Sequence, residues 1–208
     1  MITLIAYLSM TIDHFGLMVM DNDIFMRVIG RAALPAFMLM LAYGWEITRN
    51  RPNYIKRILA LAIISQPICM LVRGRMELNI CFLLVGILIL NQLIERKEYL
   101  YALLAVASWS LVPLEYGLYG LLLGCVIMNS SLIKNQKIAL VIILTSIYSV
   151  LTGDYIQMFA PVCYIVMTEI PGLLTLPAIK IPGALKYTYY PVHLIVLALV
   201  VQVLGLQH

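Results

Sequence analysis

Long apolar runs separated by short polar links dominate this sequence. Of its 208 residues, 63% are hydrophobic and 12% are charged, whereas a soluble domain is roughly 45–50% apolar and about 25% charged. A soluble fold of this length has too little interior to bury so much apolar surface. The sequence therefore predicts a polytopic membrane protein. It excludes a soluble enzyme, a disordered tail and a nucleic-acid-binding domain.

The apolar runs are numerous enough for about nine transmembrane helices (8–10), because one span needs about 20 apolar residues. We expect an all-α helical bundle that forms a single domain over residues 1–208. The segment 171–186 is rich in proline and glycine, which predicts an irregular link. The expected spans are 1–20, 24–45, 56–72, 78–94, 99–113, 116–133, 138–151, 155–170 and 187–206.

Positive charges are distributed unevenly between the links on the two sides of this bundle. Ten lie on one side and two, Arg73 and Arg75, on the other. Cytoplasmic loops carry the excess of Lys and Arg, so we expect a cytoplasmic N-terminus. The ten are Arg49, Arg51, Lys56, Arg57, Arg96, Lys97, Lys134, Lys137, Lys180 and Lys186.

Four ionisable residues lie inside the first two expected spans. Asp13 and His14 belong to the first span, and Arg27 and Arg31 to the second. Each such group costs at least about 2.5–3.5 kcal/mol at mid-span. The Asp-Asn-Asp link at 21–23 is short, so the two helices should be antiparallel neighbours with these residues at similar depth. This pattern predicts either a buried salt bridge, such as Asp13 with Arg31, or a catalytic or translocation site.

The last expected span carries a second polar group, Tyr190 and His193. Tyrosines at the start of a span often form an interfacial belt, and a core histidine with a hydrogen-bond partner is as good an explanation of His193 as a catalytic one. With this span starting near residue 187, His193 should lie in the cytoplasmic half of the membrane and His14 in the outer half.

Two further sets of residues are candidate binding groups. Gln66 in the third span and Asn79 at the start of the fourth are polar residues inside the bundle, where an interhelical hydrogen bond is the simplest explanation. Arg49, Arg51 and Arg57 form the strongest basic run, which suits phosphates but also fits a topology signal. The cysteines lie in apolar runs without CxxC spacing, so we expect no metal site.

The order of these elements resembles the TraX family, the pilin acetylases of bacterial conjugation systems. The resemblance covers nearly the whole chain. It is carried by Thr-Ile-Asp13-His14-Phe-Gly, by Gly30-Arg31-Ala-Ala-Leu-Pro35-Ala-Phe37, by Ile64-Ser-Gln66, Asn79-Ile and Tyr116-Gly117-x-x-Gly120, and by Tyr190-Pro191-x-His193-Leu194.

The resemblance implies a multi-pass acetyltransferase of the bacterial inner membrane, distantly like the broader membrane acyltransferases. Its donor would be acetyl-coenzyme A and its acceptor the N-terminal amine of a pilin or a related outward-facing group. No nucleic acid or metal is implied. The motif positions fall on Asp13, His14, Gly30, Arg31, Pro35, Gln66, Asn79 and His193.

A mechanism for acetyl transfer follows from these residues. His14 is the expected general base or an acetylated nucleophile, and His193 is a second candidate. Asp13 would orient the imidazole or pair with Arg31, while Arg27 or Arg31 would stabilise the oxyanion. A proton-coupled small-anion transporter and a non-catalytic scaffold for pilus assembly are the alternatives.

Overall fold

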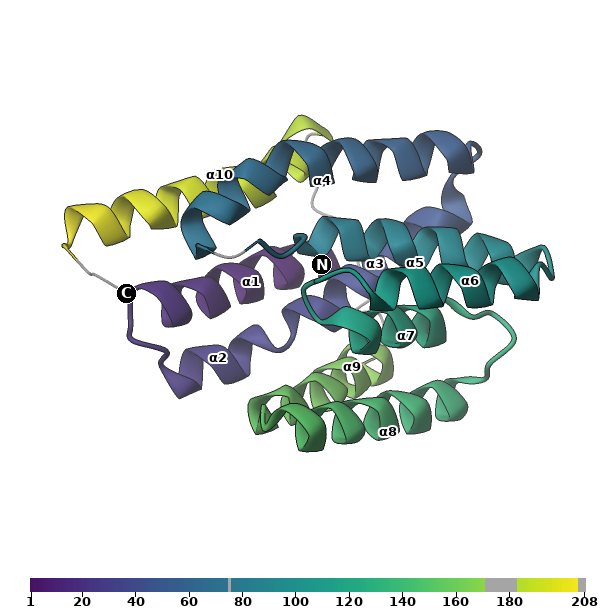
Figure 1. Cartoon of the computed structure of the whole chain (residues 1–208). Coiled ribbons are helices and arrows are strands. Elements are labelled where there is room, and N and C mark those ends of the chain that lie inside the picture. The colour runs from purple at the N-terminus through teal and green to yellow at the C-terminus, as the bar shows by residue number, and fades with distance from the viewer. Residues whose placement is uncertain (75, 171–182, 206–208) are drawn as a thin grey trace. The chain divides into compact units, whose positions relative to one another are not determined.

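A computed structural model gives the fold of the chain and describes residues 1–74, 76–170 and 183–205. Within these ranges the regular elements are all helical, which confirms the expected helical bundle (Figure 1). The helices are α1 (Ile2–Met18), α2 (Ile24–Gly30), α3 (Ala33–Ile47), α4 (Arg51–Arg73), α5 (Ile80–Glu95), α6 (Tyr99–Ser110), α7 (Gly117–Met128), α8 (Lys134–Thr152), the 3-10 helix η1 (Tyr155–Met158), α9 (Phe159–Glu169) and α10 (Gly183–Val203).

Each expected span corresponds to a helix or to a pair of consecutive helices, with two corrections. The second span is not continuous, because it breaks between α2 and α3 at Arg31 and Ala32. The last helix begins at Gly183 and not near residue 187, so the expected irregular link is too long by four residues. The rest of that link, 171–182, lies outside the described residues.

Length and composition support a membrane-type fold. Three helical segments are long and apolar enough to cross a bilayer, namely Ile24–Ile47, Arg51–Val72 and Lys134–Thr152. The first combines α2 and α3. Five shorter apolar helices of 10–17 residues accompany them: Ile2–Met18, Ile80–Glu95, Tyr99–Ser110, Gly117–Met128 and Tyr187–Val203.

The chain divides into two compact units, which we call the first unit (Met1–Met40 and Thr145–His208) and the second unit (Leu41–Leu144). In the first unit α1 contacts both α2 and α10 (Figure 1), and the 3-10 helix η1 contacts α2 and α9. An apolar cluster of Ala6, Ala36 and Met167 joins α1, α3 and α9. Helices from both ends of the sequence therefore meet in this unit.

In the second unit, α5 is the central helix and contacts α4, α6 and α7 (Figure 1). Glycines on α7 allow the close approach to α5. A Cβ on Gly124 would collide with the side chain of Ile87, and one on Gly120 would lie 2.5 Å from a methyl group of Leu83. These glycines therefore serve the close packing of the two helices.

Candidate functional site

A tight turn folds α2 back along α1 in the first unit. Asp21 and Asn22 adopt left-handed backbone conformations, with φ of 47° and 62°, which Asn and Asp tolerate better than most residues. Asp23 then caps α2, because its Oδ1 accepts a hydrogen bond from the backbone N–H of Met26 at 2.8 Å. The two helices are antiparallel neighbours, as the short link predicts.

Small residues bring α1 and α2 close enough for their charged side chains to meet. Gly30 faces Asp13 so closely that a Cβ at this position would collide with the carboxylate. Gly16 lies against Met26 in the same way, with 2.6 Å between the two Cβ positions. Gly30 is thus required as glycine by the Asp13 side chain.

Asp13 binds both arginines of the second span. Its Oδ2 accepts from Nη1 of Arg27 at 2.6 Å, and its Oδ1 accepts from Nη2 of Arg31 at 2.5 Å. The side chains of Asp13 and Arg31 are only 11% and 3% exposed. Residues at i and i+4 share one face of a helix, so both guanidinium groups reach the same carboxylate. The Asp13–Arg31 salt bridge expected from the sequence is present.

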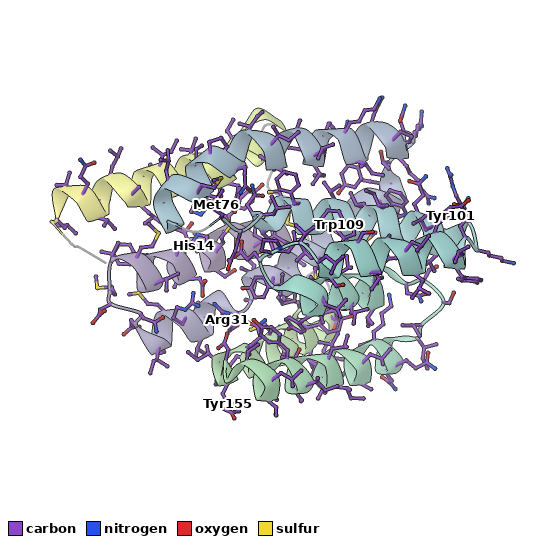
Figure 2. The ribbon with its side chains drawn as sticks, in the orientation of Figure 1. His14, Arg31, Met76, Tyr101, Trp109 and Tyr155 are labelled. Atoms are coloured by element: carbon purple, nitrogen blue, oxygen red, sulfur yellow. The ribbon has the colours of Figure 1, made fainter. Side chains whose placement is uncertain are left out.

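Arg31 lies at the break between α2 and α3 (Figure 2). The backbone N–H groups of Arg31 and Ala32 bond to carbonyls three residues earlier, which tightens the end of α2. Pro35 has no N–H to donate to the carbonyl of Arg31, which removes one helical hydrogen bond at this point and favours the break. The break turns Arg31 toward η1, where its Nη1 donates to Oε1 of Gln157 at 2.7 Å.

His14 lies on α1 (Figure 2) and its ring is hydrogen-bonded to that of His193 on α10. Nδ1 of His14 and Nε2 of His193 are 2.8 Å apart, and each residue is 7% exposed. The expectation that the two histidines lie in opposite halves of the membrane is therefore wrong. Because α10 begins at Gly183, His193 lies about 15 Å along its helix and His14 about 18 Å along α1, at 1.5 Å per residue.

For two neutral rings, the tautomers of the histidine pair are assigned from the hydrogen-bond geometry. Nδ1 of His193 lies 3.1 Å from the carbonyl oxygen of Tyr189, which can only accept, so this nitrogen carries the proton. Nε2 of His193 then accepts from Nδ1–H of His14. The remaining ring nitrogen, Nε2 of His14, carries a lone pair. The pair is thus directional, with His14 Nε2 at its basic end.

Stacked rings extend this pair toward the start of both helices. The His14 and His193 rings are 5.1 Å apart and inclined by 7°, Tyr189 stacks on His193 at 5.6 Å, and Tyr7 stacks on Tyr189 at 4.4 Å. These contacts advance along α1 and α10 in the same direction, so the two helices are parallel. Parallel first and last helices fit an odd number of spans.

The candidate residue Tyr190 and its neighbour Tyr189 have different environments. The Tyr189 hydroxyl is 2.7 Å from Oγ1 of Thr11, which ties α10 to α1. Tyr190 is buried, with its ring centroid 5.6 Å from that of His193. Tyr190 therefore belongs to the histidine cluster and does not form part of a belt at the membrane surface.

Gln66 and Asn79 pair with each other in the second unit. Oε1 of Gln66 accepts from both the backbone N–H and Nδ2 of Asn79, each at 2.9 Å. Asn79 also caps α5, because its Oδ1 accepts from the N–H of Cys81, and Gln66 donates to the carbonyl of Glu77. These contacts fasten the link between α4 and α5.

The basic run of the second unit contains one arginine with a defined carboxylate partner. Arg51 donates to Oε2 of Glu95 at 2.5 Å and lies over the Trp45 ring at 4.4 Å. Oε1 of Glu95 accepts from Trp45 and from Asn91. Arg57 lies over the Tyr54 ring at 5.7 Å. Arg49 is exposed.

The structure thus brings together the five expected catalytic residues in the first unit, with Tyr190 beside them. It places Gln66, Asn79 and the three expected phosphate-binding arginines in the second unit. Sequence reasoning missed Gln157, which is fully buried, and Glu95. The available signal for Gln157 was a lone amide inside the apolar run 155–170.

The first unit presents two polar networks on neighbouring faces of α1. Asp13 and His14 are consecutive and project about 100° apart, so the carboxylate faces the arginines while the imidazole faces His193. The arrangement places a histidine pair next to guanidinium groups, which are the kinds of group that proton transfer and stabilisation of negative charge require. It does not use Asp13 to orient His14, which was one of the two roles expected of that carboxylate.

Comparisons with known proteins place the chain in a family. The family model described as TraX protein matches residues 1–201. The probable fimbrial assembly protein FimC, serogroup H1, of Dichelobacter nodosus is 31% identical over 67 residues, which is 30% of this chain and 28% of that protein. No solved structure matches. Because the family model covers almost the whole sequence, the chain belongs to the TraX family.

Proposed function

We propose that this protein is a membrane-embedded acetyltransferase that transfers an acetyl group from acetyl-coenzyme A to the N-terminal amine of a pilin or a related outward-facing acceptor. Membership of the TraX family supports the proposal, as does the partial similarity to a protein named for fimbrial assembly. The observation that carries it is the directional His14–His193 pair, which provides a base inside an otherwise apolar bundle.

In this proposal Nε2 of His14 accepts the proton of the attacking amine. An α-amine has an unperturbed pKa of about 7.7–8.0, so near neutral pH a fraction of the acceptor has already lost its ammonium proton to water. The neutral amine is the nucleophile, and His14 takes the proton that the nitrogen sheds as it bonds to carbon. The amine nitrogen forms a bond to the thioester carbonyl carbon, and the carbon–sulfur bond then breaks. The departing thiolate then takes this amine-derived proton from His14, which gives the free thiol and restores the starting tautomer.

His193 acts as the positioning residue for His14. Its Nε2 holds Nδ1–H of His14, and its own Nδ1–H is held by the Tyr189 carbonyl. When Nε2 of His14 gains a proton, the positive charge is shared along this hydrogen-bonded pair. This is the role that a carboxylate plays in a hydrolase triad, while Asp13 is committed to Arg27 and Arg31.

Acetyl-coenzyme A is a substrate whose phosphates need cationic partners. Arg49, Arg51 and Arg57 are the proposed partners, and all three are exposed. The Glu95 carboxylate already binds Arg51, so phosphate binding at this arginine would compete with Glu95. We further propose that the protein lies in the bacterial inner membrane with a cytoplasmic N-terminus, on the basis of the uneven distribution of positive links.

The intact mass of the candidate pilin tests the proposal. It is measured from cells that express the intact protein or His14→Ala at matched membrane levels. We expect one added acetyl group with the intact protein and none with the variant. An unmodified pilin in both strains contradicts pilin as the acceptor, and an acetyl group that persists in the variant contradicts the role of His14.

A proton-coupled transporter of small anions is the second candidate function. The specific observation that favours it is a buried cluster of two guanidinium groups and one carboxylate beside a histidine pair, since charged residues inside spans often mark translocation pathways. Proteoliposomes distinguish the two. Uptake of labelled acetate driven by a proton gradient, without acetylated product, would favour the transporter.

A further inference from the structure

Arg27 and Arg31 bind the same carboxylate but differ in how many of their guanidinium N–H groups have a hydrogen-bond acceptor in the protein. Each nitrogen of Arg31 has an acceptor: Nε donates to the carbonyl of Arg27, Nη1 to Gln157 and Nη2 to Asp13. Arg27 uses Nη1 for Asp13. Its Nε is buried and has no hydrogen-bond partner in the described part of the chain. The Arg27 side chain is also more exposed, at 17% against 3% for Arg31.

An unused buried donor on a charged group is unfavourable, because the group has lost water without gaining a protein acceptor. A guanidinium group presents its donors in a rigid fork, so the unused Nε–H of Arg27 has a fixed direction. The cluster of Asp13, Arg27 and Arg31 also carries one net positive charge, with two guanidinium groups and one carboxylate. Both features match a site for one anionic oxygen.

We propose that Arg27 binds an anionic oxygen of the substrate through Nε–H, and that Arg31 is a positioning residue that holds Asp13 and Gln157. The inference deepens the proposed acetyltransferase function and rests on it for the identity of the substrate. The oxygen belongs either to the bound substrate, as a carboxylate or phosphate, or to the tetrahedral intermediate formed during transfer.

The position of Arg27 suits this role. Its partner Asp13 is adjacent to His14 in α1, and the two side chains project about 100° apart. The anion site therefore lies on the face of α1 next to the histidine pair. Arg27 would therefore bind the oxygen, and His14 would accept the proton, on neighbouring faces of the same turn of α1.

Lysine variants distinguish the proposed roles of the two arginines. Arg27→Lys keeps a cation for Asp13 but removes Nε–H, whereas Arg31→Lys removes the bonds to Gln157 and to the Arg27 carbonyl. Arg96→Lys, at an exposed arginine after α5, is the matched control. Each protein is placed in lipid nanodiscs, and kcat and KM for acetyl-coenzyme A and for a pilin N-terminal peptide are measured with the thermal midpoint.

We expect the thermal midpoint of Arg27→Lys to lie close to that of the intact protein, while its acetyl-transfer activity falls. A loss of about 10²–10³-fold in kcat, the usual effect of removing one oxyanion donor, assigns the oxygen to the intermediate. A rise in KM at unchanged kcat assigns it to the bound substrate. Arg31→Lys should lower the thermal midpoint. The proposal is overturned if Arg27→Lys keeps kcat and KM within twofold, or if its activity falls only in proportion to its thermal midpoint.

A titration with sodium acetate and inorganic phosphate separates this inference from the proposed function, because it needs no turnover. If the intact protein transfers no acetyl group but either anion raises its thermal midpoint, and Arg27→Lys abolishes the rise, anion binding by Arg27 is supported without the acetyltransferase. If there is neither transfer nor an Arg27-dependent rise, the inference is overturned.

Discussion

The two units each contain an arginine–carboxylate pair, and the pairs differ in burial. In the first unit the Asp13 and Arg31 side chains are 11% and 3% exposed, whereas in the second unit Arg51 and Glu95 are 44% and 37% exposed. A buried charge that loses its partner is strongly destabilising, while an exposed pair contributes little because water replaces the partner. Similar contacts therefore have different consequences in the two units.

Removal of the Asp13 charge should give the largest effect. Asp13→Asn leaves two guanidinium groups without their carboxylate, and we expect a loss of roughly 3–5 kcal/mol in stability. Thermal unfolding in detergent and the amount of protein in the membrane report it. An unchanged midpoint would show that the buried pair behaves like the exposed one, which would remove the difference between the units.

Loss of the Gln157 acceptor should come next. Gln157→Leu leaves Nη1 of Arg31 short of its acceptor, and a hydrogen bond to a charged group is worth about 1.5–3 kcal/mol. Gln157→Glu is the control, since it keeps an oxygen near Nη1 and neutralises the excess charge of the cluster. The account requires the leucine variant to unfold at a lower temperature than the glutamate variant.

An added methyl group at Gly30 tests the packing around the buried pair. Gly30→Ala places a Cβ against the Asp13 carboxylate, and overpacking of this kind costs about 1–3 kcal/mol. The thermal midpoint should fall, and Asp13→Ala in the Gly30→Ala background should show less than the sum of the two single effects. Strict additivity would indicate that Gly30 does not act through Asp13.

Neutralisation of Glu95 should give the smallest effect. Glu95→Gln removes the charge that binds Arg51 but keeps an oxygen for Trp45 and Asn91. We expect the stability to change by about 0–1 kcal/mol. Added salt should reduce the effect of Glu95→Gln, where the pair is exposed, more than the effect of Asp13→Asn, where the pair is buried. A loss as large as that of Asp13→Asn would contradict the comparison.

The sequence predicted the Asp13–Arg31 contact because a short link and an i, i+4 spacing leave few arrangements for four charged residues in apolar surroundings. It failed for His193, since the proline and glycine content before residue 187 concealed the start of α10 at Gly183. Four residues change the depth of a helix by about 6 Å. That shift is enough to separate a direct partner of His14 from a residue in another layer.

Uncharged partners were harder to find than charged ones. Gln157 is uncharged and lies in an apolar run, so the sequence gives no sign that it has a charged partner. In the structure it accepts a hydrogen bond from Arg31. The break at Arg31 and Ala32 was also missed, because the run 24–45 is continuously apolar around Pro35 and a proline inside a span does not by itself locate a break. Hydrogen-bond partners depend on tertiary placement, which periodicity does not specify.

The direction of the histidine pair is the central claim, and acetyl transfer by the purified protein tests it most directly. Transfer from labelled acetyl-coenzyme A to a pilin N-terminal peptide is compared for His14→Gln, His193→Gln and His193→Leu in lipid nanodiscs. We predict that His14→Gln loses the about 10²–10⁴-fold contribution of a general base, and that His193→Gln, which keeps an acceptor for Nδ1–H, remains more active than His193→Leu. Substantial activity in His14→Gln together with inactive His193→Gln would contradict the account, because His193 would then be the base.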